Sequence, residues 1–322
     1  WDPADVRYST IRWMIQPGSA YAVGPSRANP YTGELYDADI RLSADFFRFY
    51  YNDFNEFIEP IVGENFESVI ESEEDYNNHK NGRCDYAQHL SQNIAFSWNS
   101  LFTKDEISDQ QKKLTMEKFV HDGIVDLVLH EVGHTLGLRH NFKASSVYTV
   151  EQLSDPAFTA IHGVTGSVMD YNASSLLDGG HNFFQTHPGP YDLWAIEYAY
   201  SETPFDSDIN EADFLESIAS KSTHPNLVYG TDEDTYGSST RSIDPYSSSR
   251  DLSADPIRYY SNQLGLVQGF WKNLLSRFEK EGERYPKIRR VFMQGLWEYY
   301  GATRNVSKFI GGISHSRHHI GE

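Results

Sequence analysis

The sequence predicts an α+β protein in which short strands precede a long helix and a mostly helical extension follows. Three observations carry this prediction. Residues 6–14 (VRYSTIRWM) alternate and are rich in β-branched and aromatic side chains, as strands are. From residue 116 to 129, apolar side chains recur at the three- and four-residue spacings of an amphipathic helix. The same spacing returns between residues 256 and 300.

Two further strands and a turn complete the expected sheet. Residues 19–23 (SAYAV) and 38–42 (ADIRL) read as short strands, and residues 32–34 (TGE) between them are a turn signal. The apolar stripe of the following helix consists of Met116, Phe119, Val120, Ile124, Leu127 and Val128. Gly123 is the weak point of this pattern, since glycine disfavours a helix interior.

The helix runs into the motif HEVGHTLGLRH, residues 130–140. His130 and His134 are four residues apart, so both imidazoles project from one helix face and can reach one zinc ion. Gly137 can adopt the left-handed conformation that ends a helix, and the turn would bring His140 round as third ligand. Three protein ligands leave a fourth position open, which is typical of catalytic zinc. A buried amphipathic helix that happens to carry histidines is the less favoured alternative.

Six sequence blocks carry a family resemblance: WDPADVRYSTIRWM, NPYTGELYDADI, HEVGHTLGLRHNF, GSVMDYN, GPYDLWAIEY and VSKFIGGISHSRHHIGE. They resemble the metzincin clan of zinc endopeptidases, and most closely the bacterial Met-zincin family of long zinc-dependent metalloproteases. The zinc motif and the GSVMDY turn are evidence for the clan. The HNF after the third histidine and the VSKFIGG block are evidence for the family. The blocks are spread over nearly the whole chain.

The resemblance implies a metzincin-like catalytic domain with a twisted mixed sheet, an active-site helix and a lower subdomain that contains a Met-turn. It implies that Met169 forms an apolar floor under the three histidines. Tyr171 would be a fifth ligand or an oxyanion stabiliser; the alternative is a buried tyrosine hydrogen-bonded within the turn. Residues 19–23 would be the edge strand that pairs with substrate, or an ordinary edge strand. Residues 189–200 resemble the helix that closes the lower subdomain.

These elements suggest a division of the chain. Residues 1–201 would form the catalytic domain, with an upper subdomain over 1–137 and a lower subdomain over 138–201. The strand and helix that normally begin such a domain would precede Trp1, so we expect the sequence to be a segment of a larger protein. Residues 202–322 would form a loop-rich linker and a helical accessory region.

Composition excludes some function classes. The formal net charge of −19 argues against a nucleic-acid partner, because phosphate binding needs a basic surface. No stretch approaches the ~20 apolar residues of a membrane span. The single cysteine, Cys84, excludes an internal disulfide framework and reads as a buried thiol rather than an inhibitory zinc ligand. A secreted, periplasmic or cell-surface bacterial protein fits, and any signal peptide lies outside this segment.

Several other polar residues are candidates for supporting roles. Asp126, one helical turn before His130, and Asp170, next to Met169, could each orient an imidazole, although surface or capping roles are the alternative. Calcium could bind acidic residues at 64–82 or in the expected loop at 229–254, but solvation explains these charges more simply. In that loop the candidate calcium ligands are Asp232, Glu233, Asp234 and Asp251. The remaining histidines of interest are His121, His162, His181 and His187, which could crowd the cleft, and the terminal cluster of His315, His318 and His319.

The mechanism expected from these residues is zinc-assisted peptide hydrolysis. Zinc lowers the pKa of a coordinated water to near ~7, and Glu131 would accept its proton and return it to the departing amine. The metal, with Tyr171, would stabilise the oxyanion. A catalytically silent zinc-stabilised scaffold has no need of Glu131, and a zinc amidase on a non-protein substrate is a further alternative. Side-chain specificity and oligomeric state do not follow from the sequence.

Overall fold

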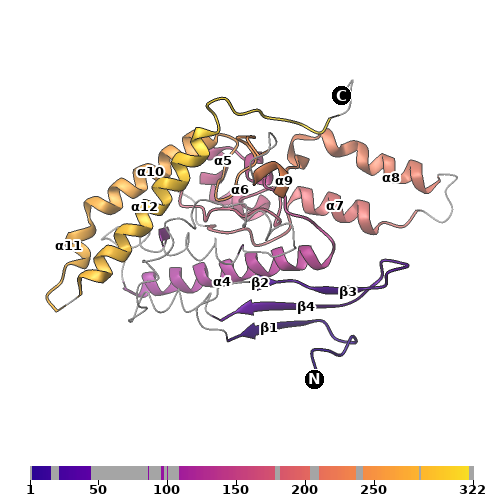
Figure 1. Cartoon of the computed structure of the whole chain (residues 1–322), viewed down its shortest axis with the longest axis horizontal. Helices are drawn as coiled ribbons and strands as arrows, with labels where there is room; N and C mark the ends of the chain where they lie inside the picture. Colours follow the sequence, from indigo (N-terminus) through magenta and orange to yellow (C-terminus); the bar gives the residue numbers. More distant parts are fainter. Residues whose placement is uncertain are drawn as a thin grey trace.

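A long central helix separates a small sheet from the remaining helices. The computed structural model describes residues 2–15, 22–44, 86, 96–97, 100, 109–177, 182–203, 210–236, 242–282 and 284–318. The central helix is α4 (Asp109–Thr135), with the sheet on one side and most other helices on the other (Figure 1). The predictions for Cys84, residues 64–82, His181 and His319 fall outside the described residues.

The sheet is mixed, as predicted. Strand β1 (Thr10–Met14) pairs in parallel with β4 (Leu35–Ser43). Strands β2 (Ala22–Val23) and β3 (Ser26–Ala28) both pair with β4 in the antiparallel sense. The α+β class predicted from the sequence is therefore confirmed.

The strand boundaries differ from the predicted ones. The first strand begins only at Thr10, and the strand expected at 38–42 extends over all of β4. Residues 19–21 of the second expected strand lie outside the described residues, and its last two residues form β2. Strand β3 was not predicted, because its three residues are all exposed and carry no alternating pattern. It reaches β4 through a turn in which Gly33 has φ +76°, at the turn predicted over residues 32–34.

Helix α4 packs on the sheet through its apolar stripe. Ile40 and Leu42 of β4 lie in one buried cluster with Phe119 and Leu127 of α4. The helix is continuous through Gly123, since the buried contacts on either side hold it. This core fixes the orientation of α4 relative to the sheet, and the zinc motif lies at the C-terminal end of the same helix.

Short helices follow on the other face of α4. They are η2 (Ala144–Val147), α5 (Val150–Ser154), α6 (Pro156–His162) and α7 (Pro190–Tyr200). The predicted helix at 189–200 thus begins at Pro190, where proline's missing N–H costs nothing. Helix α8 (Glu211–Ala219) lies beside α7, and the Trp194 indole donates to the Ile218 carbonyl at 2.8 Å.

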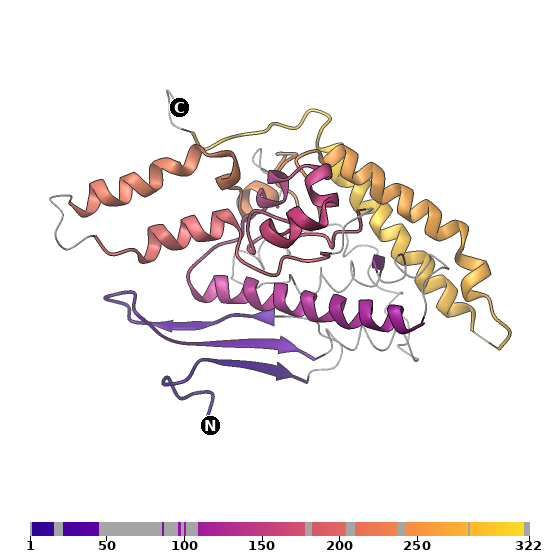
Figure 2. The same cartoon turned by 180° about the vertical axis from the view of Figure 1, so that it is seen from behind.

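The C-terminal part is helical, as predicted. After η3 (Ser220–Thr223), η4 (Pro225–Leu227) and α9 (Asp232–Thr235) come α10 (Pro256–Lys272), α11 (Leu274–Phe278) and α12 (Tyr285–Ser307). Helices α10 and α12 lie side by side, which both views show (Figures 1 and 2). Tyr259, Tyr260 and Ala302 from this pair join Tyr148 and Leu153 in a second buried cluster. Within the described ranges, no helix has the length and apolar character needed to cross a membrane.

Candidate metal centre

Three histidines converge at the C-terminal end of α4. His130 and His134 belong to the helix, and His140 to the loop that follows. One potential ligand atom from each lies within 4.8 Å of the others, and the Nε2 atoms of His134 and His140 are 3.2 Å apart. In the part of the chain that the structure describes, this is the one group of three or more His, Cys, Asp or Glu side chains close enough to hold a metal ion.

The end of α4 shows how His140 reaches the other two imidazoles. Gly137 has φ +91°, a conformation that side chains other than glycine rarely adopt. Its N–H donates to the His134 carbonyl at 3.0 Å, and the Leu138 N–H donates to the Gly133 carbonyl at 3.0 Å. These two bonds form a Schellman motif, which ends the helix and reverses the chain. The reversal returns His140 towards the helix.

The Nδ1 atom of each histidine has a hydrogen-bond acceptor. The acceptors are the Val168 carbonyl for His130 at 2.7 Å, the Leu138 carbonyl for His134 at 3.0 Å and Asp232 Oδ1 for His140 at 2.8 Å. Because carbonyls and carboxylates only accept, each Nδ1 carries the proton. The Nε2 lone pairs are then available to a metal, in the tautomer that metal-ligating histidines adopt.

Electrostatics favour the neutral form of the two helical histidines. Burial, with the nearby imidazoles of His134 and His140, lowers the pKa of His130 well below 6.5. Burial and the neighbouring His140 lower the pKa of His134 to about 4. Both imidazoles are therefore neutral at pH 7, which coordination requires.

Glu131 is fully buried where the sheet approaches α4. Gly24, which directly follows β2, lies against this residue. A Cβ atom built on Gly24 would be 2.5 Å from the Glu131 carbonyl oxygen and 3.1 Å from Glu131 Oε2. Only glycine permits so close an approach, so the end of β2 lies directly against the carboxylate. Sequence reasoning did not identify Gly24.

Met169 lies under α4 in a turn that the start of α7 holds in place. Its side chain is fully buried, and a Cβ atom on Gly133 would lie 2.2 Å from Met169 Sδ. The carboxylate of Asp192 accepts three hydrogen bonds in this turn. The donors are the Val168 N–H at 2.9 Å, the Gly189 N–H at 2.7 Å and the Ser167 hydroxyl at 2.5 Å. Asp192 thus positions the Val168 carbonyl that accepts from His130, a role that sequence reasoning missed.

Tyr171 lies beside two of the three histidines. Its ring centroid is 4.8 Å from that of His140 and 5.4 Å from that of His130. The ring of Tyr86 stacks on it at 4.8 Å. Tyr171 is completely buried in this aromatic cluster. Its role as ligand, oxyanion stabiliser or packing residue stays a prediction.

Asp126 and Asp170 accept hydrogen bonds from groups other than the three imidazoles. Asp126 accepts from the Tyr86 hydroxyl, and burial raises the pKa of Asp126 to about 7. Asp170 accepts from the Ser145 N–H at 2.8 Å at the start of η2, a capping role. The carboxylate that accepts a hydrogen bond from one of the three imidazoles is instead that of Asp232.

The prediction that the acidic residues of the loop over residues 229–254 are solvated is wrong for three of them. Asp232, Asp234 and Asp251 are buried, because this segment folds back over the loop that carries His140. Two of them pair with arginines: Asp232 with Arg139 and Asp234 with Arg317. Asp232 also accepts from His140 Nδ1. Calcium binding by these residues stays a prediction.

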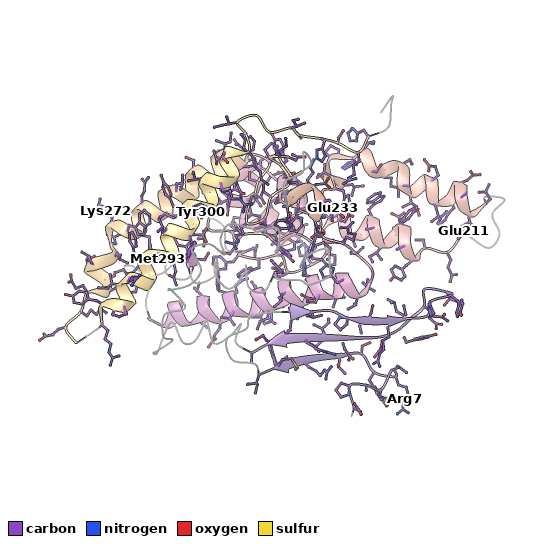
Figure 3. The ribbon with its side chains drawn as sticks, viewed as in Figure 1. Arg7, Glu211, Glu233, Lys272, Met293 and Tyr300 are labelled. Carbon is purple, nitrogen blue, oxygen red and sulfur yellow. The ribbon has the colours of Figure 1, made fainter. Side chains whose placement is uncertain are left out.

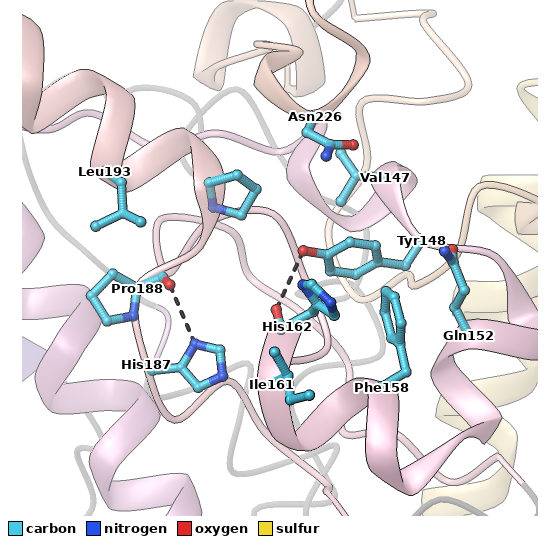
Figure 4. A pocket seen from close by; sticks show the side chains of 11 residues that line it. Val147, Tyr148, Gln152, Phe158, Ile161, His162, His187, Pro188, Leu193 and Asn226 are labelled. Atoms are coloured by element: carbon cyan, nitrogen blue, oxygen red, sulfur yellow. Dashed lines mark hydrogen bonds between the residues drawn. The ribbon is translucent and has the colours of Figure 1, made fainter.

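Two of the histidines expected to crowd the cleft line a separate pocket. His162 and His187 contribute to a pocket of about 330 Å³ between α6 and the start of α7 (Figure 4). The lining also includes Tyr148, Phe158 and Leu193, and none of the three clustered histidines belongs to it. His121 is largely exposed beside Asp122.

Comparisons with known proteins add one finding. A family model described as Met-zincin matches residues 112–322, a span that contains the three histidines, the Met169 turn and every helix from α5 to α12. No curated protein and no solved structure matches the chain.

Proposed function

This chain belongs to the Met-zincin family, and from that premise we propose that it is a zinc-dependent endopeptidase. The observation that carries the proposal is the arrangement of the three imidazoles. His130, His134 and His140 each donate from Nδ1 to a protein acceptor, which leaves three Nε2 atoms for one metal. An all-nitrogen set of three imidazoles suits zinc, whereas calcium prefers oxygen ligands.

The chain's own residues supply the rest of the chemistry. When bound, zinc would act as a Lewis acid that lowers the pKa of water to near ~7 and polarises a carbonyl. Glu131, adjacent to His130, would take the proton of the attacking water and deliver it to the departing amine nitrogen. We interpret the turn at Met169 as the Met-turn, with the thioether as an apolar support beneath the ligands. Tyr171, beside His130 and His140, would stabilise the oxyanion.

Peptides are the substrate class that the arrangement supports best. Strand β2 pairs with β4 and ends against Glu131 at Gly24. We propose that an extended peptide adds to this part of the sheet, where main-chain hydrogen bonds would align its scissile bond with the carboxylate. A silent scaffold and an amidase on non-protein substrates remain the alternatives. The location as a secreted, periplasmic or cell-surface bacterial protein stays a prediction.

Cleavage of an unstructured protein such as casein tests the proposal. We expect cleavage that a chelator abolishes and that zinc restores. Glu131→Gln should retain zinc and lose activity by about two to four orders of magnitude, since proton transfer by a positioned carboxylate contributes roughly that much. Zinc binding without casein cleavage by the wild-type chain would favour the scaffold or the amidase. Full activity of Glu131→Gln would remove the general-base assignment.

A further inference from the structure

A segment near the C-terminus contacts the short helix α9. In this C-terminal segment, residues 313–317, the Arg317 guanidinium donates to Asp234 Oδ2 at 2.5 Å and lies over the Tyr229 ring at 5.3 Å. The backbone of His315 is fixed from both sides. Its N–H donates to Asp244 at 3.2 Å, and its carbonyl accepts from the buried Lys143 at 2.6 Å.

The carboxylates of α9 connect this segment to the histidine cluster. Asp234, the partner of Arg317, also accepts from the Thr231 N–H at 2.9 Å, so the ion pair holds the start of α9. The first residue of α9, Asp232, is 8% exposed and accepts from His140 Nδ1 at 2.8 Å. Its other oxygen accepts from the Thr231 hydroxyl at 3.1 Å and from Arg139 at 3.3 Å.

His140 needs an external support more than the other two histidines do. His130 and His134 are fixed by α4, and His140 lies beyond the helix end, in irregular backbone. It is also the one of the three whose Nδ1 acceptor is a carboxylate. A charged acceptor makes a stronger hydrogen bond than a carbonyl and raises the basicity of the imidazole.

Helix α9 is too short to hold this carboxylate by itself. It has four residues, and an isolated helix of that length is unstable in water. On the exposed side of α9, Glu233, which is labelled in Figure 3, forms an ion pair with Arg139 at 2.9 Å. On the buried side of α9, the C-terminal segment supplies two side chains to Asp234. Arg317 forms an ion pair with it, and His315 Nε2 lies 4.0 Å from Asp234 Oδ1.

We propose that Asp232 is a positioning residue for His140, and that the C-terminal segment maintains this position through the Arg317–Asp234 pair. The proposal rests on the proposed function, because it assumes that His140 is a zinc ligand. It assigns a role to residues that lie more than ninety positions from the zinc motif. The C-terminal segment would thus be part of the metal centre.

Zinc affinity tests the proposal without any need for catalysis. The metal-free full chain is titrated with zinc in competition with a chromophoric chelator. We expect Asp232→Ala to weaken binding about 10- to 100-fold, the range for loss of a carboxylate that orients a histidine ligand. Asp232→Asn keeps the shape without the charge and should lose about 3- to 10-fold, and Arg317→Ala a similar factor. Glu216→Gln changes an exposed carboxylate of α8, outside the contacts described for α9, and should stay within about twofold.

Two further measurements separate positioning from general destabilisation. The visible spectrum of the cobalt-loaded protein should change in Asp232→Asn, because the geometry of one imidazole ligand changes. Urea unfolding of the metal-free chains identifies any variant that does not fold. If Asp232→Ala does not fold, the zinc affinities of Asp232→Asn and Arg317→Ala decide the question. Wild-type zinc affinity and an unchanged cobalt spectrum in Asp232→Asn and Arg317→Ala would overturn the proposal and leave the proposed function intact. Absence of zinc binding by the wild-type chain would overturn both.

Discussion

Substitution of Gly133 by alanine tests the packing of Met169 against α4. A new Cβ atom would lie 2.2 Å from Met169 Sδ, and ordinary contact begins near 3.4 Å. The sulfur would therefore have to move by about 1.2 Å, the difference between the two distances. Met169 is fully buried, so this displacement must be accommodated within a packed site.

Two opposing effects determine how much Gly133→Ala changes the free energy of unfolding. Overpacking of a buried site costs about 1–3 kcal/mol. Alanine in a helix interior is favoured over glycine by about 0.8–1 kcal/mol. In a Met169→Ala background the overpacking cost disappears, because the methionine sulfur is absent. Gly133→Ala should then stabilise the chain. The prediction is a coupling free energy of about 1–3 kcal/mol between positions 133 and 169.

Urea unfolding of the metal-free single and double variants measures this coupling. Gly265→Ala in α10 is the matched control, since no atom lies within 4 Å of the new Cβ. It should stabilise the chain by up to about 1 kcal/mol in both backgrounds. If Gly133→Ala stabilises the wild-type chain as much as Gly265→Ala does, Met169 does not pack beneath α4 as described.

Two other predictions concern the supports of the cluster. Asp192→Ala leaves the Val168 and Gly189 N–H groups without their acceptor. We therefore expect the free energy of unfolding, measured with urea, to fall by about 2–4 kcal/mol and zinc binding to weaken. An unchanged urea midpoint would contradict this prediction. The pKa of His134 is about 4 in the folded chain and ordinarily 6.5, so protonation favours the unfolded chain and stability falls as pH drops through this window. The metal-free chain should lose about 2 kcal/mol through His134 between pH 7 and pH 5, and His134→Asn should lose correspondingly less; equal losses would contradict the assignment.

The parts of the site that are local in sequence were predictable. The spacing of His130 and His134 follows from one helical turn, and the left-handed preference of glycine accounts for the reversal at Gly137. The amphipathic stripe likewise predicted α4, because burial against a sheet selects it. Each of these features depends on a few neighbouring residues.

The parts that depend on distant contacts were not predictable. Asp232 meets His140 across 92 positions, and its sequence context of acidic residues in a polar stretch indicates a solvated loop. Gly24 and Gly133 matter only because Glu131 and Met169 approach them in three dimensions. The division at residue 201 also stays a prediction, although the contact between Asp232 and His140 crosses it.

A zinc titration of the metal-free chain, followed by both binding and casein cleavage, tests the central claim most directly. We predict that one equivalent binds, that cleavage rises in proportion and that it reaches its plateau at one zinc per chain. Glu131→Gln should bind the same equivalent and show no such rise. Cleavage that is independent of zinc, or that persists undiminished in Glu131→Gln, would contradict the assignment of a zinc-dependent endopeptidase.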